Sequence, residues 1–189
     1  MPEAAQLRPA VFLDRDGTIS EEVGYLNHAS RFRIFPFVPA AIRNLHEAGF
    51  AVIVVTNQSG VGRGYFPESL VQTVHDTMTT ELASDGAKLD GIYYCPHVKA
   101  DDCECRKPNI GMLTLAAREN ALDLSRSFVV GDRYGDVELA HRAGARSILV
   151  RTGYGAGELA WHAAKWDVQP HYVAETLTEA TEWILRQPR

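Results

Sequence analysis

The residues best suited to chemistry follow a short apolar run near the start of the chain. Residues 11–13 are too few for a helix, so we predict a buried strand, and Asp14 and Asp16 come directly after it. Because the two aspartates stand two positions apart, a continuing strand would direct both carboxylates to one side, and Gly17 would let the backbone turn closely around a bound group. Two anions in one space require a cation. An isolated D-x-D-G more often forms an N-cap and a surface turn, so this motif needs support from the rest of the chain.

Two more predicted strands end in polar residues. Residues 50–55 are apolar and β-branched, and they stop at Thr56, which opens the run T-N-Q-S-G. The glycines at 60, 62 and 64 do not fit G-x-G-x-x-G, so they favour approach of the backbone to a phosphate over a dinucleotide site, and Arg63 among them could reach an anion. Residues 128–130 form the next such strand, and Asp132 follows it.

The elements between these strands have helical periodicity. We predict helices around residues 39–48, 67–84, 112–116, 139–143 and 177–185, and further strands at residues 92–94 and 147–150. Buried strands that alternate with helices are typical of a parallel α/β sheet, in which ligands bind beyond the carboxyl ends of the strands. Residues 19–37 lack periodicity and are predicted to form a loop near the site, too short for a folded cap domain. With no repeat and no linker, we expect a single domain over residues 1–189.

A second kind of site is indicated by the cysteines, all three of which fall within residues 95–105. Cys95 and His97 form a C-x-H pair, and Cys103 and Cys105 form a C-x-C pair, which together supply the four ligands of a structural zinc site. Reduced thiols beside a surface histidine are the alternative, but a random scatter would rarely place every cysteine in one short loop. The clustering also argues against a distributed disulfide framework. We therefore predict a Zn²⁺-binding loop.

The polar residues that follow the predicted strands, together with one lysine, would suit phosphoryl transfer if they met at one edge of the sheet. The set comprises Asp14, Asp16, Thr56, Lys107 and Asp132. A carboxylate that attacks a phosphate dianion meets a repulsion of about 4 kcal/mol per pair of unit charges at close range. Mg²⁺ and the Lys107 ammonium would offset this repulsion, and Asp14, Asp132 and a backbone carbonyl near Asp16 would hold the metal. Lys107 follows the zinc loop directly, although a solvated basic pair with Arg106 would look the same in sequence.

The amino-acid composition limits the kinds of binding partner that the protein is expected to have. A formal net charge of −5 over 189 residues gives no broad positive field, which argues against binding to nucleic acid or to an anionic membrane surface. Residues 1–10 lack the apolar core of a signal peptide, and no run approaches the length of a membrane span. We expect a cytoplasmic monomer that acts on a small molecule.

Four motifs resemble, in order, those of the haloacid dehalogenase-like (HAD) phosphatases: L-D-R-D-G-T, V-V-T-N-Q-S-G, C-R-K-P and G-D-R-Y-G-D, between residues 11 and 136. The resemblance implies a three-layer, Rossmann-like fold with a parallel sheet flanked by helices and no cap domain. It implies a magnesium-dependent phosphomonoester hydrolase that works through an aspartyl-phosphate. Asp14 would be the nucleophile and Asp16 the general acid and base, while Thr56 and Lys107 steady the phosphoryl group and Asp132 completes the Mg²⁺ site.

Within the superfamily, T-N-Q-S-G and the zinc loop are similar to a capless branch that hydrolyses D-glycero-D-manno-heptose 1,7-bisphosphate or histidinol phosphate. The short zinc loop and G-D-R are similar to the histidinol-phosphate members. G-Y at 24–25, Ser59, R-G at 63–64 and D-G-I-Y-Y-C-P-H are similar to the heptose members, which favours removal of the 7-phosphate of a heptose in lipopolysaccharide precursor synthesis. The residues expected to bind this phosphorylated sugar are Glu22, Val23, Gly24, Tyr25, Asn57, Gln58, Ser59, Arg63, Arg106 and Arg133.

Two other functions share part of the pattern. A phosphoacceptor signalling module also combines an aspartate, a threonine and a lysine at a sheet edge, but a lasting phosphoryl signal needs no acid at the position of Asp16. A nucleic-acid end phosphatase has related T-N-Q motifs, yet the acidic balance and the lack of an extended basic face count against it.

Overall fold

The fold is built on one parallel sheet of six strands. In a computed structural model of the chain, which describes residues 7–188, the strand order is β3-β2-β1-β4-β5-β6. The strands are β1 (Ala10–Leu13), β2 (Ala51–Asn57), β3 (Gly91–Cys95), β4 (Phe128–Gly131), β5 (Arg146–Val150) and β6 (Tyr172–Ala174). The order reverses at β1, which pairs in parallel with both β2 and β4. Such a switch point leaves a crevice beyond the strand ends in which ligands bind.

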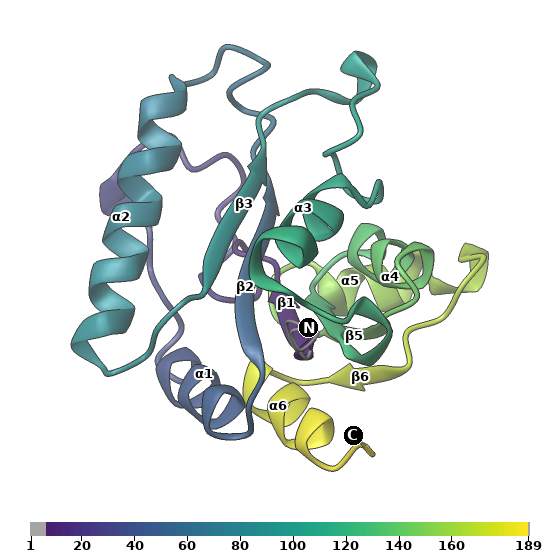
Figure 1. The fold of residues 1–189 in the computed structure, drawn as a ribbon. Helices are drawn as coiled ribbons and strands as arrows, with labels where there is room; N and C mark the ends of the chain where they lie inside the picture. The colour runs from purple at the N-terminus through teal and green to yellow at the C-terminus, as the bar shows by residue number, and fades with distance from the viewer. Residues whose placement is uncertain (1–6, 189) are drawn as a thin grey trace, which may run out of the picture.

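Helices cover both faces of the sheet, as the resemblance to the HAD phosphatases implies for a three-layer α/β fold (Figure 1). They are α1 (Val38–Glu47), α2 (Glu68–Ser84), α3 (Gly111–Asn120), α4 (Tyr134–Arg142), α5 (Gly155–Trp161) and α6 (Leu177–Leu185). Side chains alternate along β1, so Val11 and Leu13 join one apolar cluster with α1, α2 and α6, whereas Phe12 joins another with α3 and α4. This two-sided burial explains why the strands are almost uniformly apolar.

The predicted loop between β1 and α1 is confirmed. It contains only a short 3₁₀ turn, Ala29–Arg31, and it anchors itself by burying Ile19, Leu26 and Phe32 in the core. The loop thus lies against the domain and forms no cap. No helix within residues 7–188 has both the length and the apolar character needed to cross a membrane. Part of the stretch for which no signal peptide is expected, residues 1–6, lies outside the described residues.

The core should tolerate loss of volume poorly even far from the strand ends. Ile42 of α1 is fully buried, whereas Asn44 on the same helix is exposed. We expect Ile42→Ala to lower the free energy of unfolding by about 2–5 kcal/mol through lost burial and an unfilled cavity. Urea denaturation measures this, with Asn44→Ala as the control, which should stay within about 0.5 kcal/mol of the parent. A loss for Ile42→Ala as small as that of the control would contradict the packing described.

Candidate active site

Three neighbouring strands deliver their polar residues to one end of the sheet. The register pairs Leu13 of β1 with both Val54 and Val130, so the next residues of each strand lie level with one another. Asp14, Asp16, Thr56 and Lys107 line a common cavity of about 520 Å³. A more open hollow of about 630 Å³ beside α3 contains none of these groups, so we place the site in the first cavity.

Lys107 is the buried cation of this cavity. Its Nζ lies 3.0 Å from Asp14 Oδ2 and 2.7 Å from Asp136 Oδ1, and it donates to the Val55 carbonyl at 3.0 Å. Burial disfavours the ammonium, but the Asp136 and Asp14 carboxylates outweigh burial and raise the pKa of Lys107. Lys107 is therefore a fixed positive charge beside Asp14. Sequence reasoning missed Asp136, although it is the last residue of the G-D-R-Y-G-D motif.

The carboxylates of Asp14, Asp132 and Asp136 form a cluster whose ligand oxygens lie within 4.8 Å of one another. Burial raises the pKa of Asp14 to about 6, against the opposing effect of Lys107. Burial and the charge of Asp14 raise the pKa of Asp132 to about 8. Within residues 7–188, Asp132 Oδ1 has no hydrogen-bond partner although it is buried. Three buried, hard oxygen donors that require positive charge fit Mg²⁺.

Two glycines leave room for this cluster. A Cβ on Gly17 would stand 2.1 Å from Asp132 Oδ2, and one on Gly153 would stand 2.2 Å from the same atom. Both glycines also have positive φ, +80° and +57°, which side-chain-bearing residues rarely adopt. The backbone N–H of Tyr154 donates to Asp132 Oδ2 at 2.8 Å and so orients this carboxylate. The Asp16 carboxylate is not a member of the cluster. The expected contribution of a backbone carbonyl near Asp16 to Mg²⁺ binding stays a prediction.

The residues expected to bind substrate lie mostly around the cavity mouth. Those that line it are Glu22, Gly24, Tyr25, Asn57, Gln58, Ser59, Arg63, Arg106 and Arg133. Val23 is not among the lining residues; its side chain packs against the apolar core. The Asn57 amide donates to the Lys107 carbonyl and accepts from the Lys107 N–H, at 3.2 and 3.1 Å, so it holds the lysine backbone in place.

Arg133 has an aromatic neighbour that sequence reasoning did not predict. Its guanidinium carbon lies 3.7 Å from the centroid of the Tyr154 ring, a cation–π contact, and Tyr154 lines the same cavity. The tyrosine stands at the start of α5, far along the chain from Arg133, and only the return of the chain beside β4 brings the two together.

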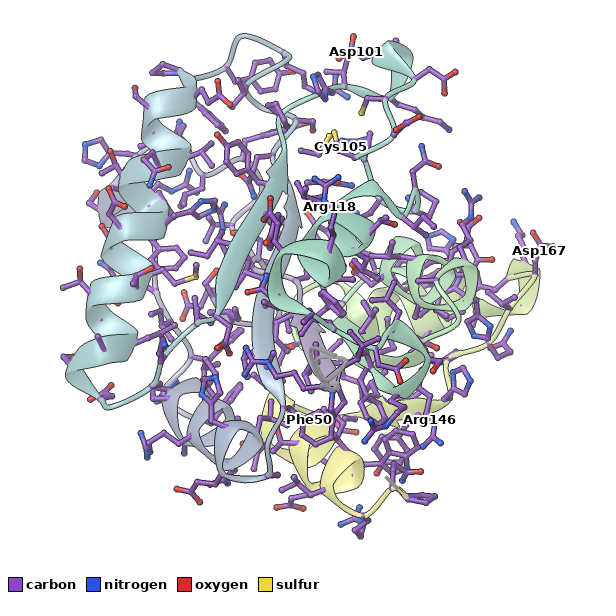
Figure 2. All side chains as sticks on the ribbon, viewed as in Figure 1. Phe50, Asp101, Cys105, Arg118, Arg146 and Asp167 are labelled. Atoms are coloured by element: carbon purple, nitrogen blue, oxygen red, sulfur yellow. The ribbon has the colours of Figure 1, made fainter. Side chains whose placement is uncertain are left out.

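The zinc ligands predicted from sequence converge in the loop after β3. The Cys95 Sγ lies 3.6 Å from both Cys103 Sγ and His97 Nδ1, and the Cys105 Sγ lies 3.3 Å from His97 Nδ1 and 3.4 Å from Cys103 Sγ. Tetrahedral bonds of about 2.3 Å to sulfur and about 2.0 Å to nitrogen place two sulfurs roughly 3.8 Å apart and a sulfur and a nitrogen roughly 3.5 Å apart. The four side chains lie close to this spacing, so they fit Zn²⁺. Figure 2 shows sulfur atoms gathered beside Cys105. Cys95 belongs to the apolar cluster that includes α3, and Cys103 and Cys105 pack against that cluster. Arg106 donates to the His97 carbonyl at 3.0 Å, which ties it to this loop.

The fold and the site define a class, the phosphoryl-transfer enzymes that place aspartates at the switch point of a parallel sheet. Residues 104–180 match the model of the HAD-hydrolase-like family. The chain is 42% identical to a D-glycero-D-manno-heptose-1,7-bisphosphate 7-phosphatase of Thermosynechococcus vestitus, over 94% of this chain and 95% of the relative. It is also 42% identical to the D-glycero-beta-D-manno-heptose-1,7-bisphosphate 7-phosphatase of Escherichia coli K12, with 96% of each chain covered.

Solved structures agree with these relatives. The D,D-heptose 1,7-bisphosphate phosphatase of B. bronchiseptica, complexed with magnesium and phosphate, has a TM-score of 0.86 at 34% identity and covers 95% of this chain and 99% of its own. The corresponding enzyme of Burkholderia thailandensis has a TM-score of 0.72 at 28% identity, over 95% of this chain and 100% of its own. The chain belongs to the HAD-like phosphatases, in the branch that contains the heptose bisphosphate phosphatases.

The zinc loop leads to a metal prediction. We expect protein purified without chelators to contain one Zn²⁺ per chain, and Cys103→Ser to lose most of it, because a hydroxyl is a poor replacement for a thiolate ligand. Elemental analysis measures the metal, and Ser125→Ala, an exposed site far from the loop, is the control. Absence of zinc from the unmutated protein would contradict the assignment.

Proposed function

We propose that this chain hydrolyses the 7-phosphate of D-glycero-D-manno-heptose 1,7-bisphosphate through a phosphorylated Asp14. The observation that carries the proposal is the buried contact of Lys107 with Asp14, beside the buried Asp14, Asp132 and Asp136 cluster, with Asp14 lining the cavity at the strand ends. The names of relatives that match nearly the whole chain support the choice of sugar. The enzyme would act as a monomer in the cytoplasm on a free metabolite, without nucleic acid or membrane.

In the first step, a carboxylate oxygen of Asp14 attacks phosphorus and the bond to the sugar oxygen breaks. Asp16 donates its proton to the departing alkoxide. The two oxygens of Asp14 are oriented beforehand, Oδ2 by Lys107 Nζ at 3.0 Å and Oδ1 by the Arg15 N–H at 2.7 Å. Lys107 also offsets the negative charge that accumulates on the phosphoryl oxygens. The Thr56 hydroxyl, at the end of β2, lines the same cavity and is placed to bind one of these oxygens.

In the second step, Asp16 takes a proton from water, which attacks the phosphorus of the aspartyl-phosphate. The bond to Asp14 breaks, phosphate leaves and the carboxylate is restored. Asp14 and Asp132 would hold Mg²⁺, which would neutralise part of the negative charge in both steps. An acid two positions after the nucleophile suits rapid turnover and is unnecessary in a phosphoacceptor signalling module.

The mouth of the cavity favours a second anion over an amine. Arg63, Arg106 and Arg133 all line it, and guanidinium groups bind phosphate oxygens through paired N–H donors. Glu22, close enough to Arg133 to interact with its charge, could accept hydrogen bonds from sugar hydroxyls. Histidinol phosphate carries an ammonium where the bisphosphate carries its second phosphate, so these arginines would repel it.

The chemical step gives the most direct prediction. We expect Asp14→Asn to abolish turnover and phosphoenzyme formation, because an amide cannot serve as the nucleophile. Asp16→Asn should form the phosphoenzyme slowly and lose about 10²- to 10⁴-fold in kcat, the usual worth of general acid–base help. Rapid-quench measurement of protein-bound phosphate separates the two variants. Phosphate release by Asp14→Asn near the parent rate would remove the mechanism, and a long-lived phosphoprotein in the unmutated chain would favour signalling.

Arg106 tests the choice of substrate. A charge-assisted hydrogen bond is worth about 1.5–3 kcal/mol, so Arg106→Ala should lose about 10- to 100-fold in kcat/KM on the bisphosphate. It should lose much less on p-nitrophenyl phosphate, which has no second phosphate, whereas Lys107→Ala should impair both. Arg126→Ala, exposed and outside the cavity, is the matched control.

The same assays compare both anomers of the heptose bisphosphate with histidinol phosphate on the unmutated enzyme. Higher kcat/KM for histidinol phosphate would overturn the proposed substrate. Equal losses on the two substrates for Arg106→Ala would mean that it serves the chemistry or the fold.

A further inference from the structure

A buried arginine stands behind the proposed general acid. The Arg15 side chain is 1% exposed, and its guanidinium binds Asp16 through two parallel contacts, Nε to Oδ1 at 3.1 Å and Nη2 to Oδ2 at 2.8 Å. A guanidinium is costly to bury, and this paired geometry is among the strongest ways to compensate it. Sequence reasoning singled out the aspartates on either side of Arg15 and assigned the arginine no role.

Arg15 is itself held from α2. His75 is 3% exposed, and its Nε2 lies 3.3 Å from Arg15 Nη1. It occupies a core-facing position of the helix, one turn from Val71 and Met78, where an apolar residue would be expected. Burial and the nearby Arg15 charge lower the pKa of His75 to about 4, so the ring is neutral near pH 7 and its Nε2 can accept from the guanidinium.

The Asp16 carboxylate remains accessible from the other side. Its side chain is 19% exposed and lines the cavity, while Arg15 is enclosed in the protein. Gln58 Nε2 donates to Asp16 Oδ2 and to Thr56 Oγ1, at 2.9 Å each. Arg15 therefore binds Asp16 from the interior, and Gln58 links Asp16 to Thr56, the residue proposed to bind the phosphoryl group.

We propose that Arg15 and His75 are positioning residues that hold the Asp16 carboxyl group in place for proton transfer to the leaving group. The proposal rests on the acid–base role of Asp16 in the proposed function. His75 fixes the Arg15 guanidinium, which in turn fixes both oxygens of Asp16. Because the Asp16 side chain is already held in one rotamer, no conformational entropy has to be lost when the proton is transferred. A purely structural ion pair would stabilise the fold but would not distinguish one leaving group from another.

Leaving groups supply the test because a poor one needs its proton and a good one does not. The measured quantity is the ratio of kcat/KM on p-nitrophenyl phosphate to kcat/KM on phenyl phosphate. These substrates are similar in shape and differ in the basicity of the departing oxygen. Both values come from one sample, so the fraction of correctly folded enzyme cancels.

We expect His75→Leu to raise this ratio about tenfold, part of the 10²- to 10⁴-fold that general acid–base catalysis provides. Asp16→Asn sets the upper limit. His75→Gln should restore most of the parent ratio, since its side-chain oxygen can accept from Arg15 near the position of Nε2. Arg15→Lys keeps the charge but not the paired contact, so it should raise the ratio like His75→Leu. Val74→Ala, a buried neighbour on α2, should lower thermal stability without moving the ratio.

An unchanged ratio in both His75→Leu and Arg15→Lys would overturn the positioning role and leave a structural ion pair. An unchanged ratio in Asp16→Asn would refute the acid role in the proposed function, on which the inference depends. Turnover of aryl phosphates with no activity on the heptose bisphosphate would refute only the proposed substrate, because the ratio does not involve the sugar.

Discussion

Like-charge repulsion among buried carboxylates is the constraint on which this site depends. Asp14, Asp132 and Asp136 bring their oxygens within 4.8 Å of one another in a buried pocket, and the only protein cation in direct contact with this cluster among the described residues is Lys107. The lysine offsets part of the negative charge and leaves the rest for a divalent ion. The same arrangement prepares for a phosphate dianion, because the positive charge that keeps the carboxylates together also lowers the cost of bringing another anion to Asp14.

The zinc loop helps to hold Lys107 in position beside these carboxylates. Four ligands close the loop between β3 and α3, and the chain leaves Cys105 directly into Arg106 and Lys107. Arg106 donates to the His97 carbonyl, and the Asn57 amide of β2 forms hydrogen bonds with both the N–H and the carbonyl of Lys107. The metal-closed loop and the end of a central strand therefore fix the same lysine from two sides. A flexible loop in this place would have to order the lysine at each catalytic cycle, at a cost in conformational entropy.

With no cap domain above the strand ends, selection of substrate falls to the rim of the cavity. The loop between β1 and α1 contributes Glu22 and Tyr25, the turn after β2 contributes Arg63, and α4 begins just after Arg133. Tyr25 packs edge-on against Tyr65 with ring centroids 4.8 Å apart, and Tyr154 supports Arg133, so aromatic rings steady two sides of the mouth. Charge and hydrogen-bonding groups predominate there, which suits a phosphorylated sugar better than an apolar ligand.

The sequence by itself determined the parallel α/β fold, the zinc ligands and the residues at the strand ends, because these depend on local signals. Apolar runs of strand length, cysteines in close pairs and polar residues directly after a strand are all readable within a short window. Only the tertiary structure decided which of these groups touch. Asp136 meets Lys107 across 29 positions, and His75 meets Arg15 across 60. Val23 lies in the right segment but faces the core. Contacts between residues far apart in the sequence depend on how the helices and loops pack back onto the sheet. Two buried charged groups form a close pair only when this packing removes both of them from water.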